Sequence, residues 1–158
     1  MAEDLKINSV LKKDKYAELF PQVKALLEGE KDRIANMANI CSALKYGMNF
    51  FWVGFYLVKE NELVLGPFQG PVACTRIKKG KGVCGKAWEE NEVIIVDNVD
   101  QFPGHIACSF LSKSEIVIPV YNSKQEIIAI FDVDSDKTAS FDKTDEEWLK
   151  KTAELLIL

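Results

Sequence analysis

The stretch EIVIPVYNSKQEIIAIFDVD, residues 115–134, decides the architecture of this chain. It holds two runs rich in β-branched residues, 115–121 and 126–133, separated by the polar turn Asn122-Ser123-Lys124. This pattern predicts two strands joined as an antiparallel hairpin. We expect the hairpin to form part of a larger sheet, because two strands alone are only marginally stable in water.

The rest of the chain supplies strands and helices around this hairpin. Apolar residues at helical or alternating spacing, with glycine stops, mark each element. We expect helices over 14–28, 30–46, 83–91 and from Asp142 or Thr144 onward, and further strands over 50–58, 63–69 and 93–96. The order predicts one α/β (α+β) domain over 1–158, with N-terminal helices in 14–46, an antiparallel sheet in 50–135 and a C-terminal helix in 142–158.

Composition excludes several classes of protein. The chain has 158 residues, a formal net charge of −4 and 47% hydrophobic residues, which is typical of a globular domain. The acidic balance disfavours nucleic-acid binding. No apolar run approaches the roughly 20 residues of a membrane span, and we see no signal peptide. We therefore expect a cytoplasmic protein that binds neither membrane nor nucleic acid.

Three of the four cysteines lie in glycine- or proline-containing segments typical of loops and element ends, namely Cys74, Cys84 and Cys108. Cys41 instead falls on the apolar stripe of an expected helix, which predicts a buried and inert thiol. In the cell interior, clustered thiols are more often redox-active or metal ligands than structural disulfides. Cys84 opens an expected helix, and a helix N-terminus lowers a thiol pKa, so we expect a reactive thiolate there.

Other thiol chemistries remain open at this point. A Cys₃His zinc site is conceivable because His105 and Cys108 are three residues apart, but the chain lacks Cys-x-x-Cys pairs. A cysteine protease fits less well, because one histidine without a nucleophile signature defines no dyad. Thiol redox catalysis, with sulfenic acid formation at one cysteine and condensation with a second, fits best.

Strand alternation brings candidate ligand-binding groups together. Trp52, Gly54 and Tyr56 share one face of the strand over 50–58, where the glycine is expected to leave room for a ligand. These rings could equally pack beneath a helix.

A second set of groups is acidic. Asp132 and Asp134 share a face of the later strand with Ile128 and Ile130, and the hairpin brings Glu115 near them. The carboxylates could simply reach water at the strand end. Together with the rings, however, they would suit a cationic or zwitterionic ligand.

The segments GPFQGPVACTRIKKGKGVCGKAW, VIIVDNVDQFPGHIACSF, SKSEIVIPVY and IIAIFDVDS resemble the free methionine-(R)-sulfoxide reductase family. The resemblance runs from about residue 50 to residue 148 and includes all three family cysteines. It implies a stand-alone GAF domain, with a central antiparallel sheet, helices on one side and a ligand pocket on the other. It implies free L-methionine-(R)-sulfoxide as substrate, which Trp52, Tyr56, Glu115, Asp132 and Asp134 would bind.

The resemblance also implies roles for the thiols. We expect Cys108 to attack the sulfoxide, Cys84 to resolve the sulfenic acid (and to be the rival nucleophile), and Cys74 to resolve or relay. Glu115 and Asp134 would assist as acids. We expect no metal and no cofactor beyond the redox-active cysteines, a thioredoxin-like reductant, and a homodimer by family resemblance. The alternatives are a GAF small-molecule sensor, since fold alone does not fix function, and a metal-binding protein.

Overall fold

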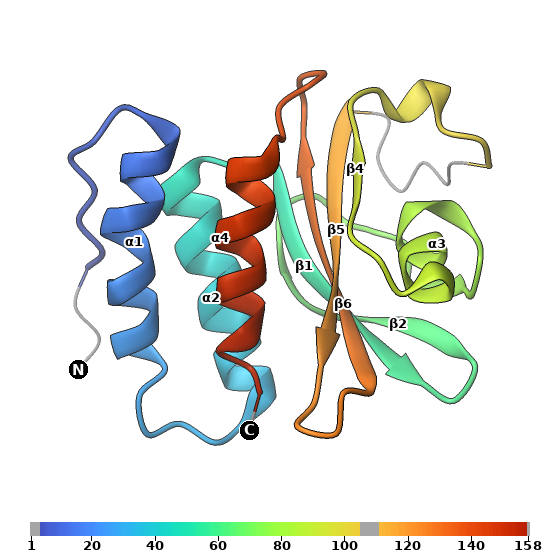
Figure 1. The fold of residues 1–158 in the computed structure, drawn as a ribbon, viewed down its shortest axis with the longest axis horizontal. Helices are drawn as coiled ribbons and strands as arrows, with labels where there is room; N and C mark the ends of the chain where they lie inside the picture. The colour runs from blue at the N-terminus through green and yellow to red at the C-terminus, as the bar shows by residue number, and fades with distance from the viewer. Residues whose placement is uncertain (1–3, 105–110, 158) are drawn as a thin grey trace.

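The computed structural model describes residues 4–104 and 111–157 and shows a sheet with helices on both faces (Figure 1). Helices α2 and α4 cover one face, α1 packs on their outer side, and α3 lies against the other face (Figure 1). The elements are α1 (Lys12–Leu26), α2 (Arg33–Met48), β1 (Trp52–Lys59), β2 (Glu62–Gln69), β3 (Arg76–Lys78), α3 (Gly82–Glu90), β4 (Ile94–Val96), the 3-10 turn η1 (Val99–Gln101), β5 (Ser114–Tyr121), β6 (Ile127–Ser135) and α4 (Lys143–Glu154). All the predicted elements are present, with bounds that differ from the predicted ones by a few residues. Strand β3 and the turn η1 are additional elements that the sequence pattern does not predict.

The strands form one six-stranded antiparallel sheet in the order β3-β2-β1-β6-β5-β4. The predicted hairpin is β5–β6, in which Ile118 lies opposite Phe131. Strand β1 adds to the far side of β6, with Phe55 opposite Phe131. The sheet therefore centres on β1 and β6, which are far apart in the sequence.

Each sheet face has its own apolar core. Val53, Phe55 and Phe131 belong to the cluster under the three helices, and the rings of Phe55 and Phe131 stack with centroids 4.5 Å apart. Trp52 and Tyr56 belong to the cluster on the α3 side. The predicted separation of Trp52 and Tyr56 from Val53 and Phe55 is confirmed, whereas Phe51, which alternation places with Val53, packs on the α3 side.

The predicted faces of β6 were wrong at its start. Val120 lies opposite Ala129 but Tyr121 lies opposite Ile127, so one extra residue bulges from β6. This bulge places Ile127 on the α3 side and Ile128 on the helical side, the reverse of strict alternation.

Local signals fix the ends of the helices. The Asp32 side chain accepts hydrogen bonds from the backbone N–H groups of Ile34 and Ala35 at the start of α2. Asp142 and Asp145 form a capping box at the start of α4. Helix α4 ends at Glu154 and is shorter than the predicted 142–158. Among the described residues, no helix has both the length and the apolar character needed to cross a membrane.

Candidate active site

The register of three neighbouring strands gathers the predicted acids on the α3 side of the sheet. Asp134 pairs with Trp52 on one side and with Glu115 on the other. Asp132 pairs with Gly54 of β1. Glu115 and Asp132 are each only 6% exposed, and Asp134 is partly buried. The carboxyl groups of Glu115 and Asp132 therefore lie inside the protein, where the alternative that the acids reach bulk water was wrong, whereas Asp134 at the strand end keeps partial access to solvent.

Helix α3 brings a thiol to these acids. The Cys84 thiol is 4% exposed and donates a hydrogen bond to Oε1 of Glu115, with Sγ and Oε1 3.8 Å apart. One ligand atom from each of Cys84, Glu115 and Asp132 lies within 4.8 Å of the others. A thiol and two carboxyl groups from α3, β5 and β6 thus meet at one point, an arrangement suited to proton transfer, thiol chemistry or cation binding.

Burial dominates the electrostatics of this cluster. Loss of hydration raises the pKa of Glu115, and the charges of Asp132 and Asp134 raise it further. The pKa of Asp132 is likewise raised, by burial and by the charge of Asp134. Burial also raises the pKa of Asp134 to about 7, against a lowering influence from a hydrogen bond with Ser112. The cluster can therefore hold a proton at neutral pH, which ordinary surface carboxylates do not.

The expected low pKa of Cys84 was wrong. Burial first, and then the charges of Asp132 and Glu115, raise the pKa of this thiol well above its usual value. The position of Cys84 near the start of α3 does favour the thiolate, but desolvation beside two carboxyl groups outweighs it. The Cys84 thiol is therefore protonated in this structure.

Aromatic side chains border the acids. Trp52 stacks on Tyr56 with centroids 6.1 Å apart and on Phe68 with centroids 5.4 Å apart. The indole N–H of Trp52 donates to the carbonyl of Pro71 at 3.0 Å, which fixes the ring. A Cβ atom at Gly54 would overlap the Trp52 ring. The space beside Gly54 is thus filled by Trp52, and the expectation that it accommodates a ligand was wrong.

The other cysteines differ in state and environment. Cys41 is fully buried in the helical core, where its thiol donates to the Pro67 carbonyl at 3.3 Å, as expected of an inert thiol. Cys74 is disulfide-bonded, whereas Cys41 and Cys84 are free. The predicted nucleophile Cys108 and the neighbouring His105 lie outside the described residues.

Sequence reasoning missed Ser112, Phe68 and the Pro71 carbonyl. Ser112 is 8% exposed and hydrogen-bonds to Asp134. Its only sequence signal is its place shortly before β5. The supporting roles of Phe68 and Pro71 depend on the β1–β2 pairing, which composition alone does not reveal.

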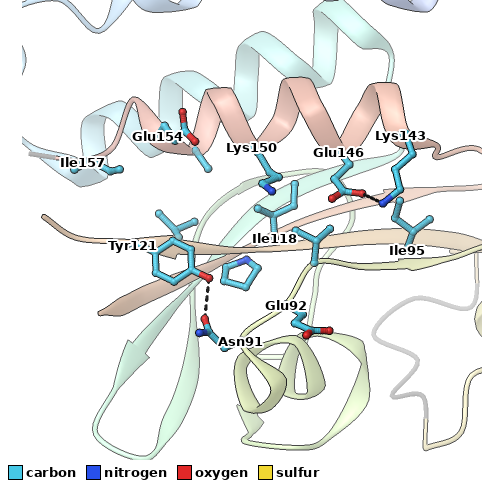
Figure 2. Close-up of a pocket in the computed structure, with 14 residues that line it drawn as sticks. Asn91, Glu92, Ile95, Ile118, Tyr121, Lys143, Glu146, Lys150, Glu154 and Ile157 are labelled. Carbon is cyan, nitrogen blue, oxygen red and sulfur yellow. Dashed lines mark hydrogen bonds and ion pairs between the residues drawn. The ribbon is translucent and has the colours of Figure 1, made fainter. Parts of the chain in front are cut away.

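A cavity lies on the helical face of the sheet, between α4 and strands β4 and β5 (Figure 2). Its volume is about 660 Å³. Apolar residues such as Ile95 and Ile118 form its floor, and charged residues of α4 such as Lys143 and Glu146 form its rim. None of its lining residues is a cysteine or a predicted site residue, so thiol chemistry belongs to the opposite face.

Comparison with known proteins identifies the family of this chain. The GAF domain family model matches residues 35–156. GAF domain-containing protein A of Dictyostelium discoideum is 59% identical, covering 99% of each chain. Free methionine-R-sulfoxide reductase of Escherichia coli is 45% identical over 86% of this chain and 82% of its own. The X-ray structure of free methionine-R-sulfoxide reductase from Neisseria meningitidis in complex with its substrate superposes with a TM-score of 0.95 at 46% identity, covering 99% of this chain and 93% of that one. The predicted fold is thus confirmed: the chain is a GAF domain that belongs to the free methionine-R-sulfoxide reductase family.

Proposed function

We infer that this protein is an oxidoreductase that reduces free L-methionine-(R)-sulfoxide to L-methionine. The observation that carries this inference is the buried meeting of Cys84, Glu115 and Asp132 beside the Trp52–Tyr56 ring pair. The likeness to a reductase crystallised with its substrate supports it. A substrate with an ammonium group, a polar sulfoxide and a methyl group matches this set of acids and rings.

We assign the binding roles from the chemistry of each group. Trp52 and Tyr56 pack against the methyl group of the substrate. Asp132 accepts hydrogen bonds from the substrate ammonium, whose positive charge favours the ionised form of this acid against the burial that raises its pKa. Glu115 and Asp134 donate hydrogen bonds to the sulfoxide oxygen. Their raised pKa values support this role, because only a protonated carboxyl group can donate.

The reaction proceeds in two thiol steps. A thiolate of the protein attacks the sulfoxide sulfur. The sulfoxide oxygen, protonated by the acid cluster, ends on the cysteine as sulfenic acid, and methionine leaves with its sulfur reduced by two electrons. A second thiol then condenses with the sulfenic acid to give a disulfide and water. A dithiol reductant restores both thiols and is itself oxidised to a disulfide.

We propose Cys108 as the attacking thiol. The raised pKa of Cys84 supports this choice, because a protonated thiol is a weak nucleophile. Cys84 then resolves the sulfenic acid or donates a proton, and Cys74 resolves or relays. The disulfide bond of Cys74 supports its participation in the exchange. A thioredoxin-like reductant and a homodimer stay predictions from the family resemblance.

One assay tests the function. Separated R and S sulfoxides, free and within a peptide, are incubated with the protein and a thioredoxin system, and methionine formation is measured. We expect turnover of the free R form alone. Tight binding of another metabolite without turnover would instead identify a GAF sensor.

A second assay tests the thiol roles. Dimedone labelling after a single addition of substrate is measured for the Cys74→Ser, Cys84→Ser and Cys108→Ser variants. We expect labelling to disappear only in Cys108→Ser. Labelling that survives in Cys108→Ser and disappears in Cys84→Ser would make Cys84 the nucleophile.

A further inference from the structure

We propose that Cys84, Glu115 and Asp132 form a binding site for a thiophilic divalent cation of the Zn²⁺ type. One ligand atom of each residue lies within 4.8 Å of the other two. The three come from three different elements, α3, β5 and β6, whose packing fixes their positions. This ligand set differs from the Cys₃His set considered from the sequence, since it uses one cysteine and two carboxyl groups.

The spacing fits a tetrahedral ion. Zn–S and Zn–O bonds of about 2.3 and 2.1 Å place sulfur and oxygen ligands about 3.6 Å apart, and two oxygen ligands about 3.4 Å apart. The Cys84 Sγ atom already lies 3.8 Å from Oε1 of Glu115. This pair would need to contract by about 0.2 Å, and the remaining pairs, which lie within 4.8 Å of one another, by at most about 1.4 Å to close the set around the ion. Water or another small ligand would take the fourth position, as in open zinc sites.

A separate observation on Asp132 points to a missing ligand. Its Oδ1 atom is buried and has no hydrogen-bond partner among residues 4–104 and 111–157. A buried oxygen of this kind loses the hydration that it would have in water, and no group in that part of the chain replaces it. A cation that Asp132 coordinates through Oδ1 would give this oxygen a partner and would replace the hydrogen bonds that Asp132 shares with Cys84 and Glu115.

The balance of charge favours a cation as well. Within the described part of the chain, no lysine or arginine forms an ion pair with Asp132 or Asp134. Binding of Zn²⁺ would release the thiol and carboxyl protons and place two positive charges among the resulting anions. Mg²⁺ and Ca²⁺ fit less well, because they require about six or more oxygen ligands and avoid sulfur.

If the proposed reductase function holds, the cation occupies the groups that the substrate needs. Bound Zn²⁺ would then inhibit turnover and would be displaced by methionine sulfoxide. The binding itself does not depend on that function, so the test below measures the cation without substrate.

Cobalt titration of the fully reduced protein tests the site, because Co²⁺ substitutes for Zn²⁺ and shows a thiolate charge-transfer band in the near ultraviolet. The protein is kept reduced with a phosphine, and Zn²⁺ is added afterwards to displace the Co²⁺. We expect one Co²⁺ per chain, a thiolate band and its loss on addition of Zn²⁺. In Cys84→Ser the band should disappear, and in Asp132→Asn the affinity should fall by roughly 100-fold.

Matched variants separate this site from the other thiols. Cys41→Ser, which removes a buried thiol of the helical core, should retain the band. Cys74→Ser should also retain it. A band that persists in Cys84→Ser, or that disappears only in Cys74→Ser, would overturn the proposal. Circular dichroism checks the fold of each variant, and should Cys84→Ser not fold, unchanged Co²⁺ affinity in Asp132→Asn would overturn it independently.

Discussion

Replacement of Asp134 by asparagine should stabilise this protein, and should do so only above acidic pH. Burial raises the pKa of Asp134 from 3.8 to about 7. Between these two pH values the folded protein keeps a proton that the unfolded chain has released. The free energy of unfolding of the wild type therefore falls by about 1.4 kcal/mol for each pH unit across this window. Below pH 4 both states are protonated, so the stability contribution is fully present there.

The full shift corresponds to a loss of up to about 4 kcal/mol by pH 7. Asp134 is partly exposed, so access of water makes this figure an upper limit. Asparagine has nearly the same shape but cannot ionise, so the unfolding free energy of Asp134→Asn does not fall in this way as the pH rises. It also removes a charge that raises the pKa of Glu115 and Asp132, and the three groups titrate as a coupled set.

The assay is urea unfolding at several values between pH 4 and pH 8, followed by tryptophan fluorescence under constant reducing conditions. The difference in unfolding free energy between Asp134→Asn and wild type should be close to zero at pH 4 and reach about 2–4 kcal/mol at pH 7.5. The control is Asp136→Asn, which changes an exposed residue two positions further on. Its difference in unfolding free energy from wild type should stay constant between pH 4 and pH 8. An equally flat difference for Asp134→Asn would refute the argument that this carboxyl group is buried protonated. Reductase activity of Asp134→Asn should fall despite the added stability, as is common where a site stores unfavourable charge.

Three further substitutions test separate contacts. Trp52→Phe removes the indole hydrogen bond to the main chain and should lower kcat/KM for free methionine-(R)-sulfoxide by roughly 10-fold or more without unfolding the protein. Gly54→Ala places a Cβ atom against the Trp52 ring and should lower the unfolding free energy by about 1–3 kcal/mol while raising KM; an unchanged urea midpoint would contradict the close approach. Lys12→Met leaves Asp145, which is 0% exposed, without its ammonium partner at 2.5 Å. It should cost about 2–3 kcal/mol, less than a fully buried pair because Lys12 is 35% exposed. KM should stay constant, and Lys13→Met at an exposed position should change stability by less than about 0.5 kcal/mol.

Local pattern was sufficient for most of the fold. The alternation in β1 separates Trp52 and Tyr56 from Val53 and Phe55, and the two apolar clusters follow that division. The polar turn after Tyr121 predicted the β5–β6 hairpin, and hairpin pairing brings Glu115 opposite Asp134. These features depend on neighbours in the sequence or directly across a turn, where periodicity constrains the answer.

The environment of Cys84 could not be predicted in this way. Its partner Glu115 lies 31 residues further along the chain, and only the packing of α3 on the sheet brings the two together. The position of Cys84 at a helix start lowers its thiol pKa, but burial beside carboxyl groups raises this pKa by more, and local sequence does not reveal that burial. The bulge that reverses Ile127 and Ile128 had the same origin, since pairing of the two strands creates it.

A buried carboxyl group is not by itself a sign of function. This protein contains one buried acid with a structural role, Asp145, and one in the candidate site, Asp132. Asp145 is completely buried, yet it accepts a hydrogen bond from Tyr16 at 2.8 Å, pairs with Lys12 and accepts the backbone N–H of Asp142. Asp132 is almost as buried, but one of its oxygens has no partner in the part of the chain that the structure describes, and the charge of Asp134 repels it. Lys12 and hydrogen-bond donors surround Asp145, whereas burial and the charge of Asp134 raise the pKa of Asp132 against the lowering effect of its hydrogen bonds with Cys84 and Glu115. The chain thus neutralises Asp145 with its own groups, while the oxygen of Asp132 without a described partner is the observation that the proposed cation site explains.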